Sequence, residues 1–457
     1  MDKHAMMVKL FREAHEKDLF TGTWLFAEKG EIVSKGAMGW SDPDDTVPVR
    51  EDMIFDLASV SKNFTATAIM LLRREGLLSL DDEITKFFPE IPYKGVTIRN
   101  LLNHTGGLPD YMEWIAETAT KENTIPDNSV IVRFLCECGK DPLFAPGEKW
   151  EYSNTGYCLL AQIVTEVSGV KFEEFLKKNI LEPAGMTSSG IIHRRMNKGT
   201  VDNLAYGMVL DLETEEYVLP DVSKDQNIVV PLDGMVGDGL IHSNIFDLLK
   251  WDRALREELV LTREEQQMMY TPGLLNSGEK AVAGIETDAP YYGFGWEIGE
   301  YPELGLIVCH SGSWPGYGLW FERFMDADKV LIILRCRDMK DGWAFRNFFE
   351  GIRSIAKGEE PGPITSIEDL AVRDPDRSGW ESFCGKYEKT GDDALYIEEV
   401  FMKNGDLYLR AIADLRGSYE LKLYPLGENV FGIKRYAFPI EFGDGCIKYL
   451  GESCKKL

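Results

Sequence analysis

The stretch Ser59-Val60-Ser61-Lys62 begins the strongest helical pattern of the chain, which predicts a helix over 59–75. Ser59 and Lys62 are three residues apart, so in a helix they share one face and are separated along the axis by about 4.5 Å. The lysine can then lie beside the serine hydroxyl, and the helix N-terminus favours the alkoxide that forms there. This arrangement is typical of a nucleophilic serine with a lysine partner.

The spacing alone is weak evidence, because four more Ser-x-x-Lys stretches begin at Ser168, Ser277, Ser354 and Ser453. The copy at Ser168 straddles Gly169, where its helix is expected to end. Those at Ser277 and Ser453 lie among turn and tail residues, and Ser354 lies at the far end of its predicted helix, where the dipole gives no help. Position at a helix N-terminus therefore favours Ser59.

A second element, Tyr152-Ser153-Asn154, is the only Tyr-x-Asn among the 18 tyrosines. A phenol beside the Lys62 ammonium is expected to have a lowered pKa, to accept the serine proton and later to pass it to a leaving group. Asn154 would offer its amide both to Lys62 and to a substrate carbonyl. Without Ser59 the motif would indicate only a turn with a half-buried tyrosine.

The third element is His310-Ser311-Gly312-Ser313, which ends an apolar strand predicted over 305–309. A strand edge of this kind can lay its backbone along a substrate, and the Ser313 N–H could join that of Ser59 in an oxyanion hole. We therefore expect Asn154, His310, Gly312 and Ser313 to bind substrate.

In this order the three elements resemble the S-x-x-K, Y-x-N and K-T-G or H-x-G motifs of the serine β-lactamase and penicillin-binding-protein superfamily. The closest resemblance is to its class C-like branch, which includes D-alanyl-D-alanine carboxypeptidases, D-aminopeptidases and serine esterases. Further matching stretches extend the resemblance over roughly 8–357, at 101–111, 145–148, 237–241 and 292–296. The resemblance implies an acyl-enzyme on Ser59, with Tyr152 and Lys62 sharing the proton as a coupled pair, and leaves open which of the two is the base.

The order of predicted elements indicates an α+β fold. Strands are expected at both ends of the first 357 residues, around a helical middle, at 23–27, 32–34, 305–309, 319–324 and 329–334, with a helix over 343–355. The resemblance implies that this part is an antiparallel sheet flanked by helices beside a helical lobe, with the site between them.

A polar, Pro/Gly-rich stretch predicts a linker over 358–378 between a hydrolase domain, 1–357, and a C-terminal domain, 379–457. Residues beyond the linker alternate in polarity, and Asn404-Gly405 is a hairpin-turn signal. These residues predict an antiparallel β barrel or sandwich, and they resemble the lipocalin-like domains attached to some members of the superfamily.

Two other stretches compete for the third motif. Lys389-Thr390-Gly391 is a literal K-T-G, but it lies in the C-terminal part and two aspartates follow it, which would oppose an anionic substrate. His104-Thr105-Gly106 precedes Tyr152, and His104 is expected to be structural, bonding its own loop. We therefore prefer His310.

A histidine at this place supplies no full positive charge for a substrate carboxylate, which puts efficient hydrolysis of β-lactams and of C-terminal D-alanine peptides in doubt. Arg335 or Arg337, at the end of an apolar strand, could compensate. Surface arginines at a strand end are an equally good interpretation.

The composition of the chain argues against several classes of binding partner. The formal net charge is −26 and basic residues occur in pairs at most, which argues against nucleic acid. No apolar stretch has the length of a membrane span or a signal region. The eight cysteines are scattered, as expected of free thiols in a reducing cytoplasm, and the six histidines have no ligand spacing, so neither a metal nor another cofactor is expected.

The expected activity is a serine peptidase or amidase acting on D-amino-acid-containing or other small peptides, in line with a cytoplasmic location. A serine esterase or a weak β-lactamase of the same fold is the alternative within this class. A non-catalytic, penicillin-binding-like recognition protein is the alternative of another class. The partner is a small molecule or a peptide, and a homo-oligomer is left open.

Overall fold

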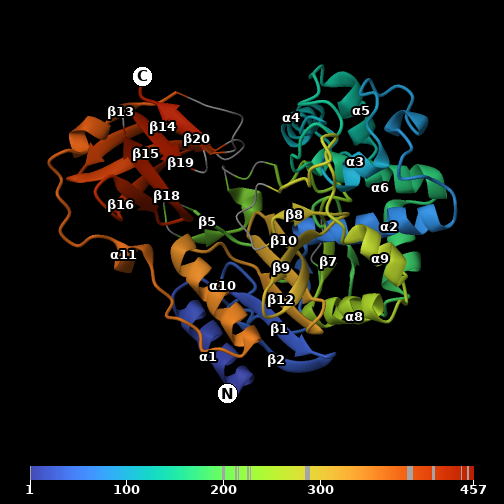
Figure 1. Cartoon of the computed structure of the whole chain (residues 1–457), viewed down its shortest axis with the longest axis horizontal. Coiled ribbons are helices and arrows are strands. Elements are labelled where there is room, and N and C mark those ends of the chain that lie inside the picture. Colours follow the sequence, from blue (N-terminus) through green and yellow to red (C-terminus); the bar gives the residue numbers. More distant parts are fainter. Residues whose placement is uncertain are drawn as a thin grey trace.

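A seven-stranded antiparallel sheet lies at the centre of the larger part of the molecule (Figure 1). The computed structural model describes residues 2–197, 201–211, 214, 216–223, 226, 228–283, 289–388, 395–413, 417–443, 445–449 and 452–457. The strands stand in the order β2 (Glu31–Met38), β1 (Gly22–Glu28), β12 (Lys329–Arg335), β11 (Tyr317–Phe324), β10 (Gly305–Trp314), β9 (Glu297–Tyr301) and β8 (Tyr291–Tyr292). The first strands of the chain thus pair with the last of this sheet, and the predicted α+β architecture is confirmed.

Helices cover both faces of this sheet, because alternate side chains of its strands point to opposite sides. In β12, Leu331 and Ile333 join a core with α1 (Lys3–Glu16) and α10 (Gly342–Lys357). Val330, Ile332 and Leu334 join the larger core on the other face, which includes α2 (Lys62–Arg74) and α8 (Ile245–Arg256). The apolar run 330–334 is therefore buried on both sides.

The helical lobe lies beyond the α2 face (Figure 1). Its helices are α3 (Ile98–Leu102), α4 (Met112–Glu122), α5 (Val130–Glu137), α6 (Asn154–Ser168), α7 (Phe172–Leu176), η3 (Lys177–Leu181) and α9 (Arg263–Met269), with short turns η2 (Ile84–Lys86) and η4 (Pro220–Val222). Two small sheets complete this part of the chain. One joins β3 (Phe55–Asp56), β7 (Ile241–Ser243) and β4 (Gly190–Ile191), and the other joins β5 (Val209–Leu210) and β6 (Tyr217–Val218). Among the described helices, none has both the length and the apolar character that crossing a bilayer requires.

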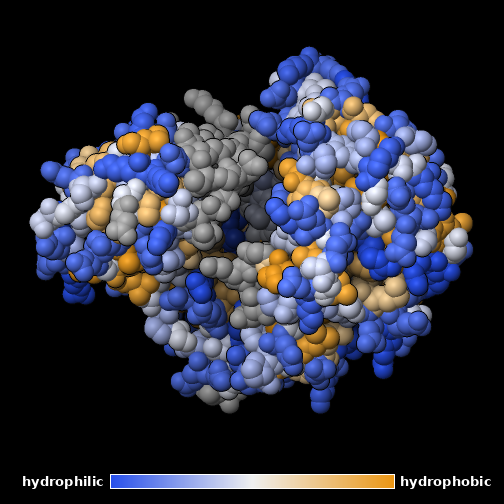
Figure 2. Space-filling model, turned by 45° about the horizontal axis from the view of Figure 1, so that its top comes forward, coloured by the Kyte–Doolittle hydropathy of each residue, from blue (hydrophilic) through white to orange (hydrophobic). Residues whose placement is uncertain are grey.

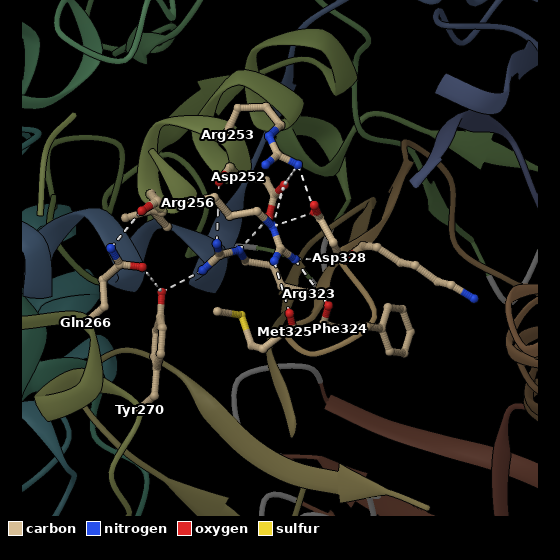
Figure 3. Close-up of polar contacts among 11 residues, drawn as sticks. Asp252, Arg253, Arg256, Gln266, Tyr270, Arg323, Phe324, Met325 and Asp328 are labelled. Carbon is tan, nitrogen blue, oxygen red and sulfur yellow. Dashed lines mark hydrogen bonds and ion pairs between the residues drawn. The ribbon is translucent and has the colours of Figure 1, made fainter. Parts of the chain in front are cut away.

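A buried ionic network ties α8 to the sheet (Figure 3). The fully buried Arg323 of β11 donates from Nε to Asp252 Oδ1 at 2.8 Å and from Nη1 to the Tyr270 hydroxyl at 2.6 Å. Arg256 Nε lies 3.1 Å from both Asp252 Oδ1 and Asp328 Oδ1. The buried guanidinium is thus paired and hydrogen-bonded, as a charge in the interior must be.

Residues beyond 378 form an eight-stranded antiparallel sheet whose strands follow one another in sequence order, which confirms the predicted C-terminal β architecture. The strands are β13 (Gly385–Lys386), β14 (Leu395–Lys403), β15 (Asp406–Ala413), β16 (Gly417–Pro425), β17 (Val430–Ile433), β18 (Tyr436–Gly443), β19 (Cys446–Tyr449) and β20 (Glu452–Lys455). The sheet curls until its two ends meet. Two hydrogen bonds join them there, from Glu388 N to Lys455 O at 2.8 Å and from Leu457 N to Lys386 O at 2.9 Å.

The segment between the two large sheets is mostly exposed but is anchored by its buried residues Ile364 and Ile367. It contains the short helix α11 (Ile367–Leu370), and the buried Ile367 donates its N–H to Asp341 Oδ2 at 3.2 Å. Next to it, α10 meets the C-terminal sheet directly, since Gly342 N donates to Lys434 O at 2.8 Å and Trp343 Nε1 donates to Ile433 O at 3.0 Å. The division into domains 1–357 and 379–457 stays a prediction.

Candidate active site

Ser59 lies in a tight turn rather than in the first turn of an α-helix. The 3₁₀ turn η1 (Ala58–Ser61) precedes α2, which begins at Lys62. Ala58 has a φ of 43°, a conformation that costs free energy for any residue with a side chain. The turn is held because Ala58 N donates to Asp56 Oδ1 at 2.8 Å and Leu57 N donates to Ile241 O at 2.7 Å.

Lys62 contacts the Ser59 hydroxyl, as the spacing predicts. Its Nζ donates to Ser59 Oγ at 3.1 Å, to Asn154 Oδ1 at 2.8 Å and to Asp238 O at 2.8 Å. These three acceptors match the three hydrogens of an ammonium group. The side chain is fully buried, and burial lowers the pKa of Lys62 to about 8, although the Asp238 carboxylate acts in the opposite direction.

Tyr152 lies next to Ser59 and Lys62, but the prediction that its pKa is lowered is wrong. Burial raises the pKa of Tyr152 well above its usual value, and the Ser59 hydroxyl opposes this rise only in part. Lys62 Nζ lies 4.9 Å from the centre of the Tyr152 ring, so the ammonium sits over the face of the ring. Desolvation therefore decides the pKa of this phenol, which stays protonated at neutral pH.

His104 positions the loop that carries Tyr152. It is buried with a φ of 61°, and its Nδ1 accepts from Ser153 N at 3.1 Å. Its ring centre lies 4.4 Å from that of Tyr152, and its carbonyl accepts from Glu151 N at 3.0 Å. His104 was predicted to bond its own loop. Its ring and its carbonyl instead accept hydrogen bonds from residues 151–153, so this prediction is corrected.

Strand β10 packs closely against the Ser59 turn. A Cβ atom on Gly312 would lie 2.6 Å from Leu57 O, so a side chain at 312 would force η1 away from the strand. Strand β9 reaches only as far as Cys309, which pairs with Glu297. Beyond this pair, the Ser311 N–H is directed to the Glu297 carboxylate. Since N–H groups alternate between the two edges of a strand, the Ser313 N–H points to the same open edge.

A small pocket of about 70 Å³ joins several of the predicted residues. Ser59, Asn154 and Ser313 line it, together with Tyr111, Met112, Trp314, Asp56 and Asp238. Tyr111 and Asp238 were not predicted as site residues, although both lie in stretches that support the resemblance. The Tyr111 hydroxyl donates to Asp238 Oδ2 at 2.9 Å, and this bond joins two segments 127 residues apart in the chain.

His310 is not among the residues that line this pocket, although its ring centre lies 6.3 Å from that of Tyr152. Its expected contact with substrate stays a prediction. The residue is 1% exposed, and burial lowers the pKa of His310 to about 3, so the ring is neutral. Nδ1 lies 2.6 Å from Ser311 O and therefore carries the proton, while Nε2 accepts from the Tyr292 hydroxyl at 2.8 Å. Both ring nitrogens are thus used within the protein, and Tyr292 in turn packs against His104 and Tyr152.

Neither arginine considered as a substitute cation lines this pocket. Arg337 forms an ion pair with Asp45, and Arg335 lies on the opposite face of the sheet, as described below. The competing stretch Lys389-Thr390-Gly391 lies outside the described residues. In the part of the chain that the structure describes, His, Cys, Asp and Glu do not gather in any group of three that could hold a metal ion.

The fold and the site together define the class of protein. An antiparallel sheet lies beside a helical lobe, and a Ser-Lys pair at the start of a helix faces a strand edge. These features are those of the β-lactamase and penicillin-binding-protein superfamily. The chain belongs to the Beta-lactamase family, whose model matches residues 8–338. It is 36% identical to Penicillin-binding protein 4* of Bacillus subtilis (strain 168) over 441 residues, which cover 96% of this chain and 94% of the relative.

Solved structures share the fold. The octameric penicillin-binding protein homologue from Pyrococcus abyssi aligns over 100% of both chains with a TM-score of 0.67 and 25% identity. The D-amino acid amidase from Ochrobactrum anthropi SV3 aligns over 78% of this chain and 97% of its own, with a TM-score of 0.61 and 22% identity. The first of these matches extends over the C-terminal sheet as well.

Proposed function

We propose that this protein is a serine hydrolase that cleaves amide or ester bonds through an acyl-enzyme on Ser59. The observation that carries the proposal is the contact of 3.1 Å between Lys62 Nζ and Ser59 Oγ, made by an amine whose pKa is lowered to about 8 by burial. A lysine with a pKa near the working pH has a usable fraction of free base.

The proposed reaction assigns one role to each group. Neutral Lys62 takes the proton of the Ser59 hydroxyl as Oγ bonds to the substrate carbonyl carbon. The N–H groups of Ser59 and Ser313 hold the oxyanion. As the bond to the leaving group breaks, Tyr152 gives its proton to that group and regains one from Lys62. Lys62 then takes a proton from water as the water oxygen bonds to the acyl carbon. The bond to Ser59 Oγ breaks, Oγ takes that proton, and the acid leaves.

Three further residues support this chemistry without supplying protons. Asn154 accepts from Lys62 and lines the pocket, where its amide can meet the substrate carbonyl. Gly312 allows the strand to approach the nucleophile. His310 is a positioning residue that acts on Tyr152 through Tyr292.

The pocket lining favours an amide next to a free amino group. Asp56 and Asp238 line the pocket, and its described lining contains no lysine or arginine. A substrate carboxylate would find no partner there, whereas an ammonium group would meet acidic side chains. We therefore infer a peptidase or amidase for D-amino acid amides and small peptides with a free amino terminus.

An intact-mass experiment tests the hydrolase proposal. A fluorophosphonate or benzylpenicillin is expected to add once per chain to the wild type and not to Ser59→Ala. The relative at 36% identity is named for binding penicillin, which supports the use of benzylpenicillin as a probe. Ser277→Ala, at an exposed copy of the Ser-x-x-Lys spacing, is the matched control and should react like the wild type. A wild type without any adduct would favour the non-catalytic recognition protein.

A substrate pair tests the amino-group preference. D-Phenylalanine p-nitroanilide is expected to exceed its N-acetyl derivative in kcat/KM by about tenfold, because acetylation removes the charge that the acidic lining attracts. An N-acetyl derivative that reacts equally well would reject the preference and leave the hydrolase assignment in place.

The oligomeric state and the cellular location of the protein are also proposed here. The solved homologue from Pyrococcus abyssi is described as octameric, and we propose a homo-oligomer for this chain, to be measured by light scattering. A cytoplasmic location stays a prediction from the sequence, and cell fractionation checks it.

A further inference from the structure

A second cavity, of about 910 Å³, lies behind the strand that closes the Ser59 pocket. Its walls come from β10, β11 and β12, from α10 and from β18 of the C-terminal sheet. In the register of the sheet, Ser311 pairs with Trp320, and Gly318 pairs with both Ser313 and Arg335. These residues therefore share one face of the sheet, opposite the face on which Gly312 meets the Ser59 turn.

The volume of this cavity is that of a ligand site. Pockets for small molecules measure about 300–1,000 Å³, and the Ser59 pocket is much smaller. Figure 2 shows the surface hollowed between the C-terminal sheet and the rest of the molecule. Ser313, at the end of its strand, lines both the cavity and the Ser59 pocket.

Arg335 is the unusual group in the wall of this cavity. It is 9% exposed, and it makes no ion pair with any residue that the structure describes. Among the described residues, its Nη1 donates one hydrogen bond to Arg337 O at 3.2 Å, and its guanidinium carbon lies 4.5 Å from the centre of the Phe345 ring. A buried cation with few partners for its N–H groups, as Arg335 has among the described residues, is costly unless an anion joins it.

The other arginines of the cavity already have partners. Arg353 lies 3.0 Å from Glu322 Oε1, Arg435 lies 2.9 Å from Asp338 Oδ2, and Arg346 lies 3.4 Å from Glu350 Oε1. Asp338 also attracts Arg335, but it is already paired with Arg435. Among the described residues that line the cavity, Arg335 is therefore the arginine without an ion pair of its own.

The remaining lining is aromatic. It includes Trp320, Phe345, Phe349, Tyr436 and Phe438. Flat apolar side chains around one cation suit a flat apolar ligand with one negative charge. A doubly charged phosphate fits less well, because Glu350 also lines the cavity.

We propose that this cavity binds a small aromatic carboxylate, with the carboxylate paired to the Arg335 guanidinium and the ring packed among the aromatic side chains. The planar guanidinium can donate two parallel hydrogen bonds to a carboxylate. This site is separate from the Ser59 pocket and does not depend on the proposed hydrolase activity.

Calorimetry with 2-naphthoate tests the proposal, because this probe has no bond that a hydrolase could cleave. We expect one site per chain, and binding that persists in Ser59→Ala. The uncharged 2-naphthamide should bind about tenfold more weakly, as should 2-naphthoate with Arg335→Gln, since each change removes one partner of a charge-assisted pair. Arg337→Gln, beside it in sequence but paired with Asp45, is the matched control and should bind like the wild type.

A second variant covers the case in which Arg335→Gln does not fold. Ala437 lies on β18 at the far wall of the cavity, so Ala437→Trp should occupy part of the space next to the aromatic side chains and weaken binding while Arg335 is kept. The melting temperature of Arg335→Gln is measured alongside and should not fall, because Arg335 has no ion pair of its own among the described residues. The proposal is overturned if 2-naphthoate does not bind, if it binds Ala437→Trp and Arg335→Gln unchanged, or if binding disappears in Ser59→Ala.

Discussion

Burial acts in opposite directions on the two proton-carrying residues next to Ser59. It disfavours the charged form of each group, so it lowers the pKa of Lys62 and raises that of Tyr152. At neutral pH this leaves an amine that readily loses its proton beside a phenol that keeps its own. The sequence left open whether Lys62 or Tyr152 is the general base. Because of these opposite shifts, we propose Lys62.

The pH dependence of the reaction follows from Lys62. Its neutral form is the base, so kcat/KM for N-acetyl-D-phenylalanine p-nitroanilide, which has no amino group that titrates, should rise with pH and level off above an apparent pKa of about 8. Lys62→Gln should lower kcat by about 10³-fold, within the range of a lost general base. Lys280→Gln, at an exposed lysine, is the control. A flat profile between pH 6.5 and pH 9 would contradict the assignment.

His310 should make the free energy of unfolding decrease at acidic pH. Its pKa in the folded protein is about 3 because of burial, whereas an unfolded histidine titrates near its ordinary value. Between these values the unfolded chain binds the extra proton, so the free energy of unfolding falls as pH drops below about 6.5. Between pH 7 and pH 5 the loss from this residue should be about 2 kcal/mol.

Urea unfolding at both pH values measures this loss. In His310→Gln the difference between pH 7 and pH 5 should shrink by that amount, whatever the variant costs at pH 7. His4→Gln, at an exposed histidine, is the control. An undiminished difference in His310→Gln would show that other groups account for the acid sensitivity.

At the scale of elements, strand β10 lies in close contact with the Ser59 turn. Gly312→Ala should push the turn away, because the added methyl group would meet Leu57 O at 2.6 Å. We expect acylation of Ser59 to slow by about 10²-fold, the cost of misplacing a reacting group by about 1 Å. Circular dichroism should show intact secondary structure.

Gly362→Ala is the matched control for this change, because nothing lies within 4 Å of a Cβ atom built there. Equal acylation rates for both variants would mean that the turn can move without loss.

The ionic network of α8 and β11 makes a prediction about stability. Asp252→Asn should lower the free energy of unfolding by about 3–5 kcal/mol, because it leaves the fully buried Arg323 without its counter-ion. Asp328→Asn, at a side chain 36% exposed, should cost much less. Urea unfolding of both variants distinguishes them, and equal losses would indicate that the network shares its charge evenly.

Strong local signals were sufficient to predict most elements. The apolar runs that form β11 and β12 and the Asn404-Gly405 turn between β14 and β15 are where the sequence places them. The short strands β13 and β20 were missed, because two to four residues are too few to show alternation. Ser59 and Lys62 meet because three residues in one turn suffice to bring them together.

The direction of the His310 ring was not predictable in the same way. It depends on Tyr292, which approaches from β8, and on the burial produced by neighbouring strands. The pKa of Tyr152 likewise depends on desolvation, which only the packed structure determines.

At the scale of the whole molecule, the C-terminal sheet is held against α10 while part of the connecting segment is exposed. Arg373 and Arg377 are exposed, whereas Ile367 is buried and Gly342 is bonded to Lys434. Trypsin should therefore cut first at Arg373 or Arg377, and the two fragments should elute together in gel filtration. Mass spectrometry identifies the cut, and fragments that separate would mean that the contact with α10 is too weak to hold them.

The closed edges of the C-terminal sheet limit how this part of the molecule can associate with others. An open edge strand offers free N–H and C=O groups that recruit a further strand, which is a common route to fibrils and to strand-swapped dimers. Here residues 386–388 and 455–457 satisfy one another. Adding strands to this sheet would first require breaking these bonds, so an interface that uses the C-terminal sheet has to be built through its side-chain surfaces.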